Sequence, residues 1–396
     1  MARRHVQTGF TLLEVLVSCS VSLVAVTAAS QALVGQYAAL QGRDLSRQAN
    51  GSAREATQFL DATLRVTGFG IDPRWALDFS YRCQAQPCRD RVDGPDELVV
   101  VSRDPRYRYQ AEGEGGCVDP AGCFTGDAWP ITDVTTGPPS LTVTLQPGTA
   151  LEAGRVVLAM CAGGQNPVML TLATAVSLSS ASPPGSVVLN QFSGDPTLGP
   201  YNATGSLLAC HGQPGAAMFL VDRSRFFVQT LGGTPWLMLD TGRDLDGDGI
   251  LPPADQDDLI PVAKNVLDMQ VAYALEPCGG YPAGPDSDGD WMIGDAKGVR
   301  EEPLTVTNPP APTYGTASND PSRCTTLSPA NVRALRVSLR LRSDKADHAR
   351  GGGWSGDVLT SPENRAGSLN VPGYRLFSAQ LDVTLRNMTS TASFIF

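Results

Sequence analysis

The stretch GFTLLEVLVSCSVSLVAV, residues 9–26, decides how this chain is built. Glu14 is its one charged side chain, and no other charged residue occurs between Phe10 and Gly42. A carboxylate near the interior of a bilayer costs about 3 kcal/mol on insertion scales. A segment this apolar therefore needs a reason to keep its glutamate.

Two kinds of export signal account for the segment but not for Glu14. An ordinary secretory signal peptide has a basic start, an apolar middle and small residues at its cleavage site, such as VTAAS at 26–30. A lipoprotein signal would use LVSC at 16–19, with Cys19 as the lipidated residue. In both interpretations the glutamate falls inside the apolar region, where it serves no purpose.

The residues around Gly9 suggest a third class. GFTLLE, residues 9–14, resembles the cleavage motif of type IV pilins and of type II secretion pseudopilins. The resemblance implies that a prepilin peptidase cuts after Gly9 and methylates Phe10, so that residues 1–9 are a leader. It also implies that Glu14, the fifth residue of the mature chain, interacts with the N-terminal amine of a neighbouring subunit during assembly.

The apolar pattern predicts one helix from Phe10 to about Val66, which would be ~85 Å long. Residues 10–38 are long enough to cross a bilayer, and Arg3 and Arg4 hold the leader on the cytoplasmic side. This predicts a single-pass inner-membrane precursor with a periplasmic head. No proline occurs before Pro73, so a proline break in the helix is not expected.

Residues 39–67 continue the helix beyond the membrane and carry an apolar stripe. The two glycines and the proline of VTGFGIDP, residues 66–73, predict its end. The stripe consists of Leu45, Ala49, Ser52/Ala53, Ala56, Leu60 and Leu64.

The rest of the chain, residues 68–396, predicts a β-rich globular head, since its 41 glycines and 30 prolines (whole-chain counts) favour turns over helices. Residues 231–235 read as a hairpin turn, and 104–138 and 276–330 as long loops. We therefore expect an α+β, pilin-like fold, with a long N-terminal helix packed on an antiparallel sheet that has large loop insertions. The predicted strands are 97–103, 140–146, 155–161, 168–176, 186–192, 217–231, 235–240, 267–275, 333–342 and 374–387.

One predicted strand has a strict alternation. Leu335, Val337, Leu339 and Leu341 alternate with a polar face that contains three arginines, which indicates a half-buried strand. That arginine face is either solvated or a docking surface for an acidic neighbour.

The eight cysteines beyond Cys19 predict disulfides in an oxidising compartment. Zinc is the alternative, but no C-x-x-C pair occurs. The short spacings favour the first two of the four pairs, and the other two are a working choice among the remaining cysteines. The predicted pairs are Cys83–Cys88, Cys117–Cys123, Cys161–Cys210 and Cys278–Cys324.

The loop DLDGDGILPPAD, residues 244–255, has the spacing of a calcium-binding loop. A glycine makes the bend, alternate carboxylates face one ion, and a main-chain carbonyl adds a ligand. Its candidate ligands are Asp244, Asp246, Asp248, Ile250 and Asp255. A weaker candidate repeats the alternation at Asp286, Asp288 and Asp290 but has Trp291 in place of the glycine. A plain polar turn is the alternative for both.

The family resemblance can be narrowed. Residues 54–73, 263–275, 332–343 and 374–387 resemble successive blocks of PilW-type minor pilins. This implies a complex with other minor pilins and the major pilin, to which a PilY-type tip adhesin can be added, that primes pilus assembly at the tip. A J-like pseudopilin of type II secretion and an exported calcium-dependent binding protein are the alternatives.

Composition and motifs exclude other classes. The net charge of −10 argues against nucleic acid as a partner, since an acidic surface does not track a phosphate backbone. The chain has no metalloprotease, serine-hydrolase or nucleotide-binding signature, so we expect no enzymatic activity.

Overall fold

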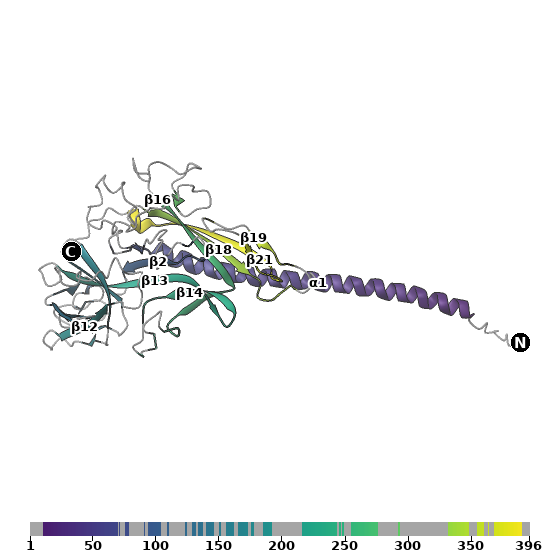
Figure 1. Ribbon diagram of the computed structural model, residues 1–396, viewed down its shortest axis with the longest axis horizontal. Helices are drawn as coiled ribbons and strands as arrows, with labels where there is room; N and C mark the ends of the chain where they lie inside the picture. The colour runs from purple at the N-terminus through teal and green to yellow at the C-terminus, as the bar shows by residue number, and fades with distance from the viewer. Residues whose placement is uncertain are drawn as a thin grey trace.

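The structure, a computed structural model, has one long helix that projects from a β-rich head (Figure 1). It describes residues 11–69, 71, 76–78, 91, 94–103, 109–110, 123–124, 129–131, 134–137, 140–145, 150–151, 156–161, 165–172, 176–177, 185–191, 216–243, 245–246, 248, 255–275, 292–293, 332–347, 355–359, 363 and 368–389.

The helix α1 runs from Leu12 to Arg65 without a break. At about 1.5 Å per residue it is ~81 Å long. The predicted helix is therefore confirmed over the described residues, and Phe10 lies outside them. α1 contains a stretch that is apolar and long enough to cross a membrane, and none of that stretch is buried.

The two halves of α1 have different surroundings. Every side chain from Leu12 to Tyr37 is exposed, and the first buried residue of the helix is Gly42. Beyond that point α1 enters the head, as Figure 1 shows. The predicted apolar stripe is confirmed, with Ser52 and Ala53 half-buried and the other members buried. The buried residues of α1 are Gly42, Leu45, Ala49, Ala56, Leu60 and Leu64.

α1 ends where the sequence predicts, and the end is held by a distant part of the chain. Gly68 has a φ of +76°, a conformation that glycine adopts without strain. The side-chain amide of Asn387 donates to the carbonyls of Arg65 and Thr67, 3.2 and 3.3 Å away. Two of the carbonyl groups left over at the helix end thus find a donor.

The larger sheet has 11 strands, and every pairing in it is antiparallel. Its main order is β1-β2-β13-β9-β10-β12-β7-β6, while β5 and β14 pair with β13, and β15 pairs with β14. Its strands are β1 (Leu77–Asp78), β2 (Leu98–Arg103), β5 (Trp129–Pro130), β6 (Val134–Gly137), β7 (Ser140–Leu145), β9 (Val156–Cys161), β10 (Gln165–Leu172), β12 (Gly185–Gln191), β13 (Ala217–Leu231), β14 (Thr234–Asp240) and β15 (Ile260–Lys264).

The smaller sheet has the antiparallel order β17-β16-β18-β21. Its strands are β16 (Val266–Leu275), β17 (Met292–Ile293), β18 (Val332–Arg342) and β21 (Leu376–Thr384). Three further pairs of short strands are β3 (Tyr109–Gln110) with β4 (Cys123–Phe124), β8 (Ala150–Leu151) with β11 (Val176–Ser177), and β19 (Val358–Leu359) with β20 (Leu369–Asn370). A short 3-10 helix, η7, spans Arg386–Thr389.

The core lies where α1 packs against β15, β18 and β21. Leu60 and Leu64 of the helix are fully buried there. The apolar face of β18 joins the same cluster, so the predicted alternation at Leu335, Val337, Leu339 and Leu341 is confirmed. Each such leucine contributes about 1.5–3 kcal/mol by leaving water. The fold class predicted from the sequence, a long helix on an antiparallel β head, is confirmed.

Some predictions about individual elements are wrong. Residues 104–138, expected as a loop, contain the short strands β3, β4, β5 and β6, and 276–330 contain β17. The predicted strand 168–176 is divided into β10 and β11, and 374–387 shortens to β21. β15 was not expected, because Pro261 argues against a strand; it is accommodated where the ladder with β14 shifts register. Strands of two residues are too short to show any alternation.

Candidate assembly and ion-binding sites

The N-terminus of α1 is closed by a hydrogen-bonded pair, Thr11 and Glu14. The Thr11 hydroxyl accepts from the Glu14 backbone N–H at 3.3 Å. The Glu14 carboxylate accepts, through Oε2, from the Thr11 backbone N–H at 2.9 Å and from its hydroxyl at 3.0 Å. This is a capping box, which satisfies two donors that a helix start leaves without partners.

The capping box fixes where the Glu14 carboxylate points. It turns the carboxylate back along the helix, toward the residue that precedes Thr11, and places the negative charge at the positive end of the helix dipole. Glu14 was singled out from the sequence, but Thr11 was missed, although the T-x-x-E spacing signals it. Gly9 and Phe10 lie outside the described residues, so cleavage and methylation there stay predictions.

The outer half of α1 has no cover from the described parts of the head. Its large side chains are strongly exposed; Leu12 is 82% exposed, Leu23 70% and Tyr37 71%. An apolar surface of this extent is stable in water only when something covers it, and a bilayer or the helices of other subunits would do so. Cys19 lies on this surface as a free, exposed thiol.

The predicted disulfides are not tested by the structure. Cys83, Cys88, Cys117, Cys210, Cys278 and Cys324 lie outside the described residues. Cys123 is in β4 and Cys161 is in β9, where the backbone alone is described. All four pairings stay predictions.

The acidic loop connects β14 to β15, and buried carboxylates hold both of its ends. At the first end Asp240 accepts from the Gly242 backbone N–H at 2.6 Å and from the buried Arg223 at 3.4 Å. At the second, fully buried Asp258 accepts from the Leu245 N–H at 2.5 Å. Sequence reasoning missed both anchors, although the Asp-x-Gly turn at 240–242 is a signal for the first.

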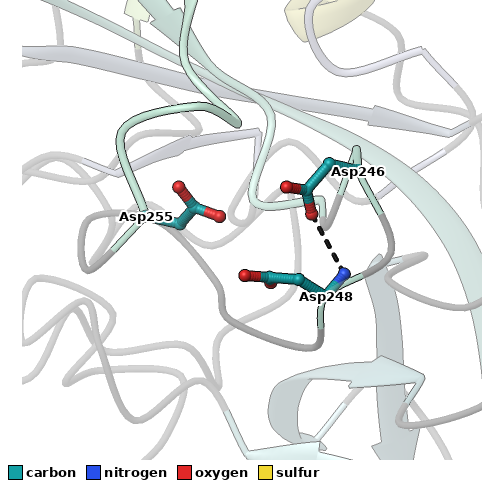
Figure 2. Close-up of side chains that lie close together, drawn as sticks. All are labelled: Asp246, Asp248 and Asp255. Atoms are coloured by element: carbon teal, nitrogen blue, oxygen red, sulfur yellow. Dashed lines mark hydrogen bonds between the residues drawn. The ribbon is translucent and has the colours of Figure 1, made fainter.

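Three of the predicted calcium ligands come together in this loop. Carboxylate oxygens of Asp246, Asp248 and Asp255 all lie within 4.8 Å of one another (Figure 2). The Asp248 backbone N–H donates to Asp246 at 3.0 Å, which tightens the turn between them. Asp244 and Ile250 lie outside the described residues, as do the weaker candidates Asp286, Asp288 and Asp290.

The spacing of these oxygens suits one cation. Ligand atoms that bind the same Ca²⁺ at about 2.4 Å can be at most ~4.8 Å apart. Without a cation, two carboxylates at that distance repel each other by about 1 kcal/mol even in water. Asp246 and Asp248 are exposed and Asp255 is half-buried, so solvent reaches the cluster.

The arginine face of β18 differs from both interpretations of the sequence. Arg336 pairs with Asp382 at 3.2 Å, and Arg342 stacks 4.6 Å over the ring of Tyr374. Burial lowers the pKa of Arg340, an effect opposed by the carboxylates of Asp268 and Glu363. The face is therefore neither simply solvated nor open for docking, because contacts within the head occupy it.

Comparison with known proteins yields one match. Residues 4–30 match the family model described as the prokaryotic N-terminal methylation motif. None of the curated proteins or solved structures matches this chain.

The match has consequences for the class of protein. It supports a type IV pilin or a type II secretion pseudopilin, a structural protein whose precursor is processed by prepilin peptidase and assembles with other pilins. Together with the apolar helix, it is consistent with a membrane-anchored subunit that later enters a fibre.

Proposed function

We propose that this chain is a PilW-type minor pilin of a type IV pilus. The observation that supports this most directly is the N-terminal methylation motif on a helix whose outer half is apolar and uncovered. The four sequence blocks that resemble PilW-type proteins favour the minor-pilin role over that of a major subunit. In this role the chain joins other minor pilins in a complex that primes assembly and stays at the pilus tip.

The proposal assigns a step to each part of the N-terminus. The precursor sits in the inner membrane with its head in the periplasm until the peptidase cuts after Gly9 and methylates Phe10. Glu14 then pairs with the N-terminal amine of a neighbouring subunit, a cation that compensates its charge in an apolar setting. The capping box supports this, because it already directs the carboxylate toward the helix start.

Two measurements separate this proposal from its alternatives. Mass spectrometry of the mature protein should find methylated Phe10 at the N-terminus. A start near Ala29, or a lipidated Cys19, would instead make the segment an export signal and the head an exported binding protein. Deleting the gene should remove surface pili and twitching while leaving secretion intact; the reverse pattern would indicate a J-like pseudopilin.

We also propose that the acidic loop binds calcium through Asp246, Asp248 and Asp255. The supporting observation is the convergence of their oxygens in a loop whose ends are fixed by Asp240 and Asp258. Millimolar calcium should raise the melting temperature of the full-length chain in detergent, and EDTA should reverse the rise. An unchanged melting temperature in both conditions would contradict this assignment.

A further inference from the structure

A groove lies where α1 leaves the head, and arginines from two parts of the chain line it. Its volume is about 550 Å³, within the range of ligand pockets. Six of its lining residues form the polar part of the argument: Gly42, Arg43, Ser46, Arg47 and Asn50 from the helix, and Arg375 from the segment before β21. In Figure 1 the labels of β19 and β21 lie beside this part of α1.

The head holds Arg375 firmly at the groove. Its guanidinium Nε donates to Asp347 at 2.6 Å, and the Asp347 side chain is fully buried. Its backbone N–H donates to the Ser343 hydroxyl at 3.2 Å, and its carbonyl accepts from the Ser343 N–H at 2.8 Å. The arginine therefore reaches the helix from a fixed position.

The two helix arginines are exposed and have charge to spare. Neither Arg43 nor Arg47 has an ion-pair or hydrogen-bond partner for its side chain in the structure as described. Asp44 is next to Arg43 in sequence, but it is not one of the residues that line the groove. The groove thus carries two uncompensated positive charges and a third guanidinium, which favours an anion with several acceptor oxygens.

The position of the groove along the helix identifies the anion. From Val15 to Gly42 the chain has no charged residue, and 28 residues of helix extend ~42 Å. This matches the roughly 40–45 Å of a bilayer including its headgroups. Arg43 is the first charged residue after that run, and the head begins there, since Gly42 is the first buried residue of α1.

We propose that this groove binds the phosphate of a phospholipid headgroup in the outer leaflet of the membrane that the precursor spans. The inference rests on the membrane-anchored stage of the proposed function. The ligand class is an anionic phospholipid, whose phosphate meets Arg43 and Arg47 while Arg375 closes the groove from the head. The contact holds the acidic head at a fixed height above the bilayer until the subunit is extracted into the fibre.

The test uses the full-length chain in lipid nanodiscs made from equimolar phosphatidylcholine and phosphatidylglycerol. Native mass spectrometry of the released protein measures which lipid stays bound. Wild type should retain phosphatidylglycerol in preference to phosphatidylcholine. The double variant Arg43→Gln/Arg47→Gln should lose this preference by about fivefold for each arginine, as expected for about 1 kcal/mol per basic residue at a membrane surface.

The matched control is Arg54→Gln. Arg54 is an exposed arginine of the same helix, ~11 Å further into the head than Arg47, and is not a residue of the groove. The control should keep the lipid preference of wild type. Arg375 is left unchanged in the test, because removing it would leave buried Asp347 without this partner and endanger the fold.

Four outcomes would overturn the proposal. A wild-type chain that fails to insert, shown by extraction at alkaline pH, would overturn membrane anchoring and this inference together. An inserted chain without lipid preference would overturn the groove assignment alone. Displacement of the lipid by millimolar inorganic phosphate would make the groove a general anion site. An unchanged lipid preference in the double variant, with loss of co-purification with other pilins, would make it a subunit contact.

Discussion

The guanidinium of Arg375 lies directly against Gly42, where the helix enters the head. A β-carbon built on Gly42 would be 2.7 Å from Nη2 of Arg375, a distance that real β-carbons do not reach. Because Arg375 is fixed by Asp347, it cannot easily move aside. Gly42 is therefore a glycine because the head touches the helix backbone there.

This contact predicts opposite effects for two glycine substitutions in α1. Replacing a helical glycine by alanine normally stabilises by about 1 kcal/mol. Gly51→Ala should show that gain, since a β-carbon at this position would meet nothing within 4 Å. Gly42→Ala should instead lower the free energy of unfolding by about 1 kcal/mol or more, because it overpacks the contact. Denaturant titration of the full-length chain in detergent measures both, and equal stabilisation by the two would contradict the contact.

The sequence predicted the parts of the fold that depend on local pattern. The stripe from Leu45 to Leu64 and the alternation of β18 each repeat for several turns or strand positions, so burial of one face could be inferred. The contact of Gly42 with Arg375 joins residues more than 300 positions apart, and no local pattern encodes it. In the sequence alone, Gly42 is simply a glycine within a helix that has no proline.

The candidate sites were predicted to the same depth. A fixed spacing revealed Glu14 and the alternate aspartates of 244–255, because the chemistry of each site is contained in one short segment. The buried groups that hold the loop ends were missed. Asp240 meets Arg223 across two strands, and Asp258 meets the loop from its far end, so their roles emerge only when the strands are paired.

Variants at the helix start separate the capping role of Glu14 from its charge. Glu14→Gln keeps a residue suited to the capping box but removes the charge for the neighbour's amine. It should leave cleavage and methylation intact and abolish incorporation into pili, measured by immunoblot of sheared fibres. Incorporation at the wild-type level would show that the charge is not needed.

The complementary variant is Thr11→Val, which keeps the carboxylate and removes the capping hydroxyl. Loss of an N-cap side chain costs about 1 kcal/mol, so the first turn of α1 should fray and incorporation should fall without being abolished. Thr11→Ser, which restores the hydroxyl, should recover it. Mass spectrometry of the mature N-terminus checks that cleavage is unaffected in each variant.

The calcium proposal predicts a difference between two neighbouring aspartates. Asp255→Asn removes a charge from the cluster, and it should weaken calcium binding by about tenfold or more and reduce the calcium-induced rise in melting temperature. Asp257→Asn is the matched control, because Asp257 is exposed in the same turn but is outside the cluster. Isothermal titration with calcium compares them. Equal loss in both would point to a general effect of charge.

The turn between the two sheets predicts a pH-dependent contribution to stability. Asp344 is paired with Lys264 at 2.5 Å and accepts from the Asn265 side chain at 3.1 Å. The hydrogen bonds from Lys264 and Asn265 lower the pKa of Asp344 below its ordinary value. A carboxyl group whose pKa is lower in the folded chain stabilises the fold above its unfolded pKa, and this stabilisation disappears as the pH falls through its folded pKa.

Asp344→Asn should therefore reduce the free energy of unfolding at pH 7, and the difference from wild type should shrink below about pH 4 as the wild-type carboxyl is protonated. The effect should be modest, since both partners are partly exposed and solvent screens the pair. Denaturant titrations across this pH range measure it. Asp44→Asn, on the exposed surface of α1, should show no such pH-dependent difference. A loss of stability in Asp344→Asn that persisted undiminished to pH 2 would mean that packing, and not the charge, makes the contribution.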